Sequence, residues 1–278
     1  MKKKIFTALL SFIALCAGIS AQEAAKNHGH LALGVEASST GFGLELAAPL
    51  NSNFALRGGV SLFPSYNYNY AFNVNLTESI KNNINNEINS EPDILNQLNQ
   101  NGLPTRAEDI DTNFKTTAAL NFLNGKILID FYPSAKYAFH ITGGVYIGKS
   151  DIVKIKGKMD QAVEVLKVLQ PYHDYFNETV IADGNYQLTG NDLRDMQGVL
   201  RVNSVKPYFG IGFGRAAPKS RVGVNFEIGA FYQGAPKLAG NNNNVQKLID
   251  SESSRVTDVL NQLPVYPVIS LKLNFRLF

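Results

Sequence analysis

From residue 30 onward, apolar side chains recur at every second position in eight separate segments. The segments are residues 31–36, 42–48, 54–62, 126–131, 139–147, 209–213, 222–230 and 269–277. A period of two sends successive side chains to opposite faces of a β-strand. The pattern therefore predicts eight strands, each with one bulky apolar face.

The residues opposite the bulky row decide the class of protein, because a soluble barrel with an apolar lumen shows the same alternation. A solvated face would carry Lys, Glu and Thr, but this face is rich in glycine: Gly34, Gly43, Gly59, Gly144, Gly210, Gly212, Gly214, Gly223 and Gly229. Small residues beside large ones suit the inside of a narrow barrel. We expect the bulky row to face lipid, and the fold to be all-β, an eight-stranded antiparallel up-and-down transmembrane β-barrel.

The connections between the expected strands differ in length. Three are turn-like (residues 49–53, 133–137 and 218–221), and a fourth, at 38–41, is also short. The other three are long, at 78–113, 160–204 and 240–265. Counted along the chain, all three long connections fall at the end opposite the first three turns. This asymmetry is typical of bacterial outer-membrane barrels, whose long loops are extracellular.

The long connections contain apolar residues at helical spacing. They are Ile80, Ile84, Ile88, Ile94, Leu95 and Leu98; then Val163, Leu166 and Leu169; then Val245, Leu248, Ile249, Val256, Val259, Leu260 and Leu263. A helix with one narrow apolar stripe is not stable alone in water. The spacing predicts three helix-containing extracellular loops whose stripes pack together as a cap.

The first segment resembles a secretory signal peptide. Lys2, Lys3 and Lys4 precede an apolar run that ends in the small residues Ser20 and Ala21. We expect cleavage after Ala21, a short tail at 22–29, and a barrel domain at 30–278 in the bacterial outer membrane. The single cysteine, Cys16, lies inside the signal. A lipid anchor there is a minor alternative, because Leu15 stands where a small residue is needed.

Composition narrows the function. Of the residues, 45% are hydrophobic and 18% are charged, and without the three signal lysines the chain has 23 basic and 23 acidic residues. A neutral body argues against nucleic-acid binding. The mature chain has no cysteine, which excludes disulfides, thiol catalysis and Cys-based zinc sites. We predict no cofactor, because His28, His30 and His173 lack a third metal ligand at a defined spacing.

Three segments carry a resemblance to a known family. They are the ending YPVISLKLNFRLF (Tyr266 to Phe278), GFGLELAAPL (Gly41 to Leu50) and PYFGIGFGRAAP (Pro207 to Pro218). With the strand count, they resemble the small outer-membrane β-barrel proteins of the OmpX and OmpW kind. The resemblance implies that Phe275 and Phe278 form an assembly signal for the outer-membrane insertion machinery. Phe278 departs from the family pattern, because it is out of phase with Phe275 and Leu277.

Nine ionisable side chains are predicted to point into the barrel. They are Glu36, Glu45, Arg57, Lys126, Asp130, His140, Glu227, Lys272 and Arg276. Unpaired charge inside a protein is costly, so opposite charges are expected to pair across strands and plug the lumen. A proton or solute path is the alternative. His140 could act as a general base beside Asp130 or Glu45, although a satisfied interior histidine fits the pattern better.

Three lysines extend past the expected membrane span of the fifth strand. Lys154, Lys156 and Lys158 could contact the phosphates of lipopolysaccharide, or could pair with loop acids on a solvated strand extension.

Two functions from different classes follow. The first is a non-enzymatic outer-membrane barrel with a plugged polar lumen and a helical cap, which serves envelope integrity or surface interaction. Its expected partners are outer-membrane lipids, lipopolysaccharide and an extracellular ligand that the sequence does not identify. The alternative is a transporter of small hydrophobic molecules or lipids. A lipid-modifying enzyme ranks third, because no base and nucleophile pair can be placed at the outer mouth.

Overall fold

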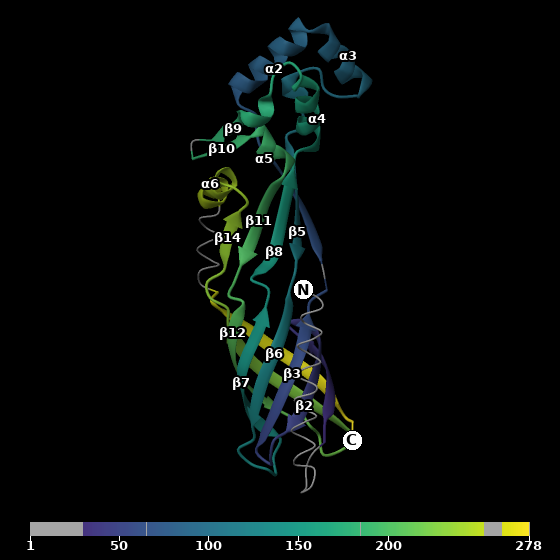
Figure 1. The fold of residues 1–278 in the computed structure, drawn as a ribbon, viewed down its shortest axis with the longest axis vertical. Coiled ribbons are helices and arrows are strands. Elements are labelled where there is room, and N and C mark those ends of the chain that lie inside the picture. The colour runs from purple at the N-terminus through teal and green to yellow at the C-terminus, as the bar shows by residue number, and fades with distance from the viewer. Residues whose placement is uncertain (1–29, 65, 184, 253–262, 278) are drawn as a thin grey trace.

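The computed structural model describes residues 30–64, 66–183, 185–252 and 263–277. The expected signal peptide (1–21) and tail (22–29), and Phe278 of the expected assembly signal, lie outside these ranges. The molecule is elongated: a β-barrel stands at one end, a sheet rises from it, and helices gather at the far end (Figure 1). We call these parts the barrel, the neck and the cap.

The barrel is closed, antiparallel and eight-stranded, as the alternation predicts. Its strands are β1 (Ala32–Ser38), β2 (Gly41–Pro49), β3 (Phe54–Leu62), β6 (Leu123–Phe131), β7 (Phe139–Gly148), β12 (Val205–Phe213), β13 (Val222–Tyr232) and β15 (Val265–Arg276). Each strand pairs with its neighbours in chain order, and the last strand closes the wall by pairing with the first, Ala32 opposite Arg276.

The two faces of the barrel wall are arranged as predicted. Along β12, for example, Phe209, Ile211 and Phe213 are exposed, whereas Tyr208, Gly210 and Gly212 between them are buried. Interior glycine makes room for large neighbours. A Cβ on Gly229 would lie 2.4 Å from the Tyr208 hydroxyl, and one on Gly212 would lie 2.6 Å from His140 Nε2. Glycine is therefore needed at these two positions, where a side chain of the neighbouring strand lies too close for a Cβ.

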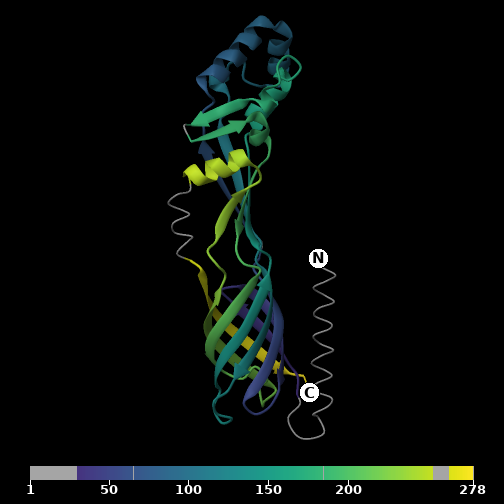
Figure 2. The same cartoon turned by 60° about the vertical axis from the view of Figure 1, so that its left-hand side comes forward.

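The neck is a five-stranded sheet that the alternation analysis did not predict. It consists of β4 (Asn67–Asn73), β5 (Asn113–Leu120), β8 (Asp151–Lys158), β11 (Met196–Arg201) and β14 (Lys237–Gly240), in the spatial order β14-β11-β8-β5-β4. These strands extend the chain beyond β3, β6, β7, β12 and β13. β1 and β2 are joined through residues 39 and 40 alone, so the neck stands over one side of the barrel (Figure 2).

The cap is built from the long connections. It contains α2 (Glu78–Ser90), α3 (Pro92–Gln100), α4 (Asp160–Leu169), α5 (Gly190–Arg194) and α6 (Asn243–Glu252), the short 3-10 turns η1 (Ala107–Asp109) and η2 (Tyr175–Asn177), and the hairpin of β9 (Thr179–Asp183) with β10 (Tyr186–Thr189). No helix in the described ranges is long and apolar enough to cross a membrane.

Residues from all three long connections share one hydrophobic core in the cap. The predicted stripe of α2 (Ile80, Ile84, Ile88) is buried there with Ile94 and Leu98 of α3, the stripe of α4, and Val245 of α6. Leu95 and Leu263 are exposed instead, and Val256, Val259 and Leu260 lie outside the described residues. The packing of the stripes into one cap is thus confirmed for the part of the chain that the structure covers.

Candidate functional site

The interior of the barrel holds a connected cluster of charged side chains. Of the nine predicted interior ionisable residues, eight are buried on the inner wall: Glu36, Glu45, Arg57, Lys126, Asp130, His140, Glu227 and Lys272. They come from β1, β2, β3, β6, β7, β13 and β15, so they join strands all around the wall.

Arg57 is the centre of this cluster. Its side chain is fully buried. Its Nη1 donates to Glu45 Oε1 at 3.2 Å, and its Nη2 donates to Asp130 Oδ1 at 2.7 Å and to Glu227 Oε2 at 2.6 Å. The planar guanidinium has five donors, so one side chain can satisfy carboxylates from three strands.

Two lysines complete the cluster. Lys126 forms ion pairs with Glu36 and with Glu45, the latter at 2.9 Å. Lys272, from the last strand, lies 3.7 Å from Glu45 and 3.4 Å from Glu227. Each of the four carboxylates therefore faces at least one cationic donor from a distant part of the chain, which is the arrangement that makes buried charge tolerable.

His140 and two acids form a group with metal-like proximity. Donor atoms of Asp130, His140 and Glu227 all lie within 4.8 Å of one another. Arg57 Nη2 sits within 2.7 Å of both acids, in the position a cation would take. Thr142 also donates to Asp130 at 2.7 Å. The positive charge that these acids need is already supplied by the protein, so the group does not fit a metal centre.

Arg276 is the one predicted interior residue that lies elsewhere. Its side chain is exposed at the barrel end near the short turns, and Nη1 donates to the Lys219 carbonyl oxygen at 3.1 Å. The prediction is wrong because strand parity stops constraining the side chain where β15 ends at Arg276. Phe275, the described half of the expected assembly signal, lies on the outer face.

Lys206 was not predicted and is buried in the upper part of the barrel. Its Nζ donates to Asn124 Oδ1 at 2.9 Å. The same atom lies 5.5 Å from the centre of the Phe122 ring and 5.7 Å from that of Phe231. With Lys206 counted in place of Arg276, four buried acids again meet four buried bases in the barrel. Its even position on β12, shared with Tyr208, was the signal that could have found it.

Above the charged cluster, aromatic side chains fill the lumen. Phe122, Tyr146, Tyr208, Phe231 and Tyr266 pack with Leu128 and Val268. The Phe231 and Tyr266 rings are stacked with centroids 5.0 Å apart, and Tyr146 lies 5.3 Å from Phe231. The Tyr208 hydroxyl donates to Glu227 at 2.6 Å, which joins the aromatic cluster to the ionic one. We call the charged cluster (Glu36, Glu45, Arg57, Lys126, Asp130, His140, Glu227 and Lys272) the ionic layer, and the aromatic cluster above it the aromatic layer.

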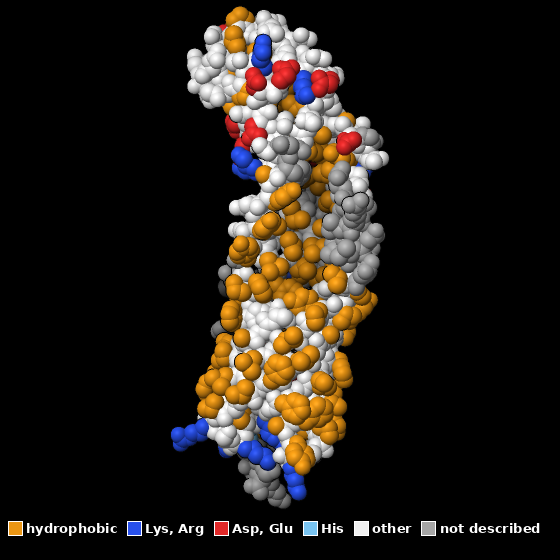
Figure 3. Space-filling model, turned by 180° about the vertical axis from the view of Figure 1, so that it is seen from behind, with side chains coloured by type: hydrophobic (Ala, Val, Ile, Leu, Met, Phe, Trp, Pro, Cys, Tyr) orange, Lys and Arg blue, Asp and Glu red, His pale blue; other side chains and the backbone are white. Residues whose placement is uncertain are grey.

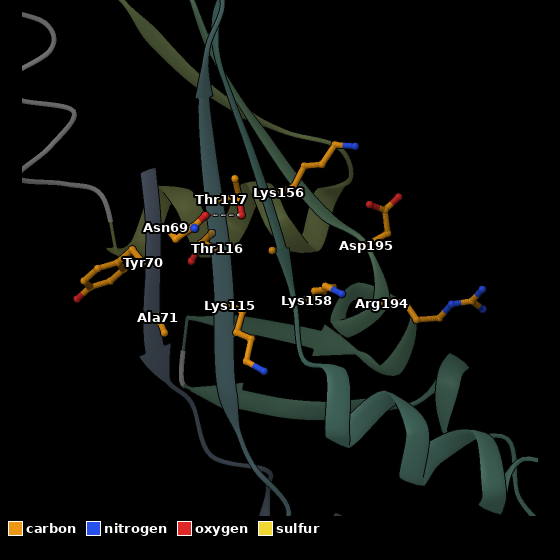
Figure 4. Close-up of a pocket in the computed structure, with 11 residues that line it drawn as sticks. Asn69, Tyr70, Ala71, Lys115, Thr116, Thr117, Lys156, Lys158, Arg194 and Asp195 are labelled. Atoms are coloured by element: carbon orange, nitrogen blue, oxygen red, sulfur yellow. Dashed lines mark hydrogen bonds between the residues drawn. The ribbon is translucent and has the colours of Figure 1, made fainter. Parts of the chain in front are cut away.

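The three predicted lysines lie on one face of the neck. Lys154, Lys156 and Lys158 are exposed on β8. Lys156 and Lys158 line a hollow of about 700 Å³ together with Lys115, Arg194 and Asp195 (Figure 4). Lys158 pairs with Asp160 at 2.7 Å, and this hydrogen bond holds the pKa of Asp160 below its usual value. Within the described ranges, Lys154 and Lys156 have no ion-pair partner.

One buried carboxylate in the cap, that of Asp192, forms hydrogen bonds with residues of two long connections. Asp192 of α5 accepts hydrogen bonds from Thr189, from Asn242 Nδ2 at 2.6 Å and from Asn244 Nδ2 at 2.9 Å. Burial raises the pKa of Asp192, but the hydrogen bonds from Thr189, Asn244 and Asn242 outweigh it and hold the pKa below its usual value. Thr189 and Asp192 also form the capping box of α5, so this site joins the second and third long connections.

Comparison with known proteins places the chain beside two solved structures. No protein-family model and no curated protein sequence matches it. The chain is similar to the crystal structure of Acinetobacter baumannii CarO2, with 15% identity and a TM-score of 0.41, and to that of Acinetobacter baumannii CarO, with 16% identity and a TM-score of 0.40. In each comparison the match covers 90% of this chain and 100% of the other. These values are too low to carry a functional inference.

Proposed function

We propose that the protein is a non-enzymatic barrel of the bacterial outer membrane that holds its neck and cap outside the cell for surface interaction. The observation that carries this proposal is the belt of exposed apolar side chains around a charged interior. In this arrangement the barrel anchors the protein in the membrane, the neck holds the cap away from the bilayer, and the cap presents a surface to the outside.

The belt has the composition of a lipid-facing surface. Phe42, Phe209 and Phe213 are 63%, 63% and 64% exposed, and Val224 and Leu271 are 59% and 54% exposed. Soluble monomers rarely expose a contiguous apolar patch larger than a few hundred Å². Hydrophobic side chains instead cover the face of the barrel seen in Figure 3 over its height, and every barrel strand contributes exposed apolar residues. Hydrocarbon is the solvent in which such a surface is stable.

The filled interior favours an anchor over a channel. The ion pairs of Arg57, Lys126 and Lys272 link six strands, His140 adds β7 through Glu227, and the aromatic layer covers this ionic layer. A solute crossing the barrel would have to separate buried ion pairs and displace stacked rings, each of which costs several kcal/mol. This supports a sealed barrel and counts against the alternative, a transporter of small hydrophobic molecules through the lumen.

The exposed lysines of β8 are suited to binding an anionic group at the membrane surface. Lys154 and Lys156 lie a few residues beyond the end of β7, on the polar face of the neck. We propose that they contact lipopolysaccharide phosphates. Binding of intact lipopolysaccharide to the folded protein should fall when both lysines become Gln, and dephosphorylated lipopolysaccharide should bind the wild type as weakly as it binds the variant. Lys237→Gln, on the far edge of the same sheet, is the matched control.

The anchor proposal is tested by fractionation and topology. The mature protein should enter the outer-membrane detergent fraction and migrate differently on a gel before and after boiling. An epitope inserted after Gly102, an exposed turn with open space around it, should be detected on intact cells. Recovery in a soluble fraction, or detection of the epitope only after lysis, would refute the proposal. Steady conductance in a planar bilayer would refute the sealed interior and favour the transporter.

A further inference from the structure

The neck sheet has one apolar and one polar face. Residues that stand opposite each other in an antiparallel pair share a face, so the register assigns every position. One face, which we call the apolar neck face, consists of Tyr68, Tyr70, Thr116, Ala118, Leu120, Val153, Ile155, Gly157, Met196, Gly198, Leu200, Leu238 and Gly240. The other face carries Lys115, Lys154, Lys156, Lys158 and Lys237. All these lysines avoid the apolar neck face.

The apolar neck face continues the inner wall of the barrel. Leu120 packs against the aromatic layer, and it has the same even parity as Phe122 and Asn124 inside the barrel. On β11, Leu200 has the parity of buried Val202 and Lys206. The face therefore looks across the top of the barrel, toward the side where β1 and β2 end in the turn at residues 39 and 40.

In the part of the chain that the structure describes, both ends of this face are covered and its side is left open. The aromatic layer lies below it, with Tyr266 bonded to the Ser39 carbonyl at 2.8 Å, so it gives no passage into the lumen. The cap core lies above, reached by Phe114 and Met196. On the edge strand β4, Tyr68 and Tyr70 remain 61% and 60% exposed. Among the described residues, the approach left to an apolar molecule is from the side, over the turn that joins β1 and β2.

The exposed apolar surface runs from the lipid-facing belt to this face. Phe42 and Leu62 are register partners at the top of the belt and are 63% and 50% exposed. Phe63 follows at 39%, and β4 with its tyrosines begins four residues later. Seen from behind, hydrophobic side chains continue from the barrel over the neck toward the cap (Figure 3).

We propose that the apolar neck face binds an acyl chain of an outer-leaflet lipid, which leaves the bilayer over the turn that joins β1 and β2. An acyl chain needs no polar partner, and this face offers one only in the hydroxyls of Thr116 and the tyrosines. The inference rests on the proposed membrane location. It goes beyond that location by assigning a lipid-binding surface above the bilayer, separate from the barrel belt.

The test uses the folded mature protein in phospholipid nanodiscs containing a small share of palmitoyl phosphatidylethanolamine with a diazirine on the acyl chain. After photolysis, labelled peptides are mapped by mass spectrometry. We expect label on the belt and also on residues 66–71 and 153–155 of the neck. A parallel sample with diazirine palmitic acid distinguishes a membrane lipid from a free fatty acid as the source of the chain.

The sheet supplies its own matched controls. Ala118→Phe fills the apolar neck face, whereas Ala119→Phe places the same ring on the opposite face of the same strand. Neck labelling should fall at least fivefold in Ala118→Phe and stay within twofold in Ala119→Phe. If Ala118→Phe fails the heat-modifiability check, Tyr68→Lys on the exposed edge replaces it, with Asn67→Lys as its control.

The outcomes separate the two proposals. Belt labelling without neck labelling, or equal neck labelling in both alanine variants, overturns the lipid-binding inference and leaves the membrane location standing. Cross-linked dimers joined through the neck, without probe on it, would assign the face to a second copy and also overturn the inference. Absence of label on the belt would refute the membrane location itself.

Discussion

Replacing Arg57 by Met tests whether the barrel interior behaves as a dry, charge-balanced core. The wild-type ionic layer sets Glu36, Glu45, Asp130 and Glu227 against Arg57, Lys126 and Lys272. Without Arg57, four carboxylates face two lysines. Asp130 then has no cationic partner, and Glu45 and Glu227 keep only lysines.

Breaking a buried ion pair by removing one partner costs about 3–5 kcal/mol, mainly because the other charge is left uncompensated. Arg57 pairs with three acids, so we expect Arg57→Met to lower the free energy of unfolding by about 3–5 kcal/mol or more. The measurement is equilibrium urea unfolding in detergent or vesicles, with each species checked for folding by its gel shift. Arg221→Met, in an exposed turn, is the control and should change stability by no more than about 0.5 kcal/mol.

A second substitution locates the source of the loss. Asp130→Asn in the Arg57→Met background removes the orphaned charge and should recover part of the lost free energy. Should Arg57→Met lose less than about 1 kcal/mol, or should Asp130→Asn make it worse, the interior would have to be solvated and the reasoning from buried charge would be wrong.

Three further predictions follow from other parts of the molecule. Gly229→Ala should destabilise the barrel by about 1–3 kcal/mol, because the new methyl would meet the Tyr208 hydroxyl, whereas Gly143→Ala, with nothing within 4 Å, should be near neutral in the same unfolding assay. Phe231→Ala should cost about 3–5 kcal/mol and should raise single-channel leak if the aromatic layer seals the lumen. The lowered pKa of Asp192 means that its contribution to cap stability is complete above the unfolded pKa of about 3.9 and is lost as pH falls toward the folded value. The protection factors of the cap amides, which correct for the intrinsic pH dependence of hydrogen exchange, should therefore fall below about pH 4 in the wild type, but Asp192→Asn should show a flatter acid profile.

Each of these three predictions can be contradicted by a specific result. Equal stability of the two glycine variants would mean that both the Tyr208 ring and the Phe209 carbonyl can move aside at little cost. A non-leaking Phe231→Ala barrel would assign the seal to the ionic layer alone. An unchanged acid profile in Asp192→Asn would mean that another group controls the acid sensitivity of the cap.

The alternation was sufficient to predict the barrel because strand parity and the bulk of the outward-facing side chains are both local properties. Gly210, Gly229 and Tyr208 illustrate this: each lies on the wall face that its position in the alternation predicts. The same parity places most of the ionic layer, since inward charges in a narrow tube have few places to go except against each other. Arg276 was misplaced because a strand end no longer fixes its side chain.

The neck was not predicted as a sheet: β11 lies within the long connection expected at 160–204, β4 lies between the expected strands and connections, and β8 was expected only as an extension of the fifth strand. The alternation of Tyr68 and Tyr70 with Asn67 and Asn69 is as regular as any in the barrel. This short alternation stands outside the eight segments from which the barrel was predicted. The aromatic layer was not predicted either: Tyr146 and Phe231 have interior parity, but on the same face they are outnumbered by glycines. Pairing between β5, β8 and β11 is non-local and could not be assigned from one sequence.

The pairing of the first strand with the last has a consequence for biogenesis. Lys272 is carried by β15, so Glu45 and Glu227 receive one of their cationic partners only when the final strand arrives. Until that moment both the hydrogen-bonding edge of β1 and the electrostatic balance behind it are incomplete. Sealing the tube and neutralising its contents are therefore one event, and a chain truncated before Lys272 would be left with an unpaired edge and an excess of negative charge.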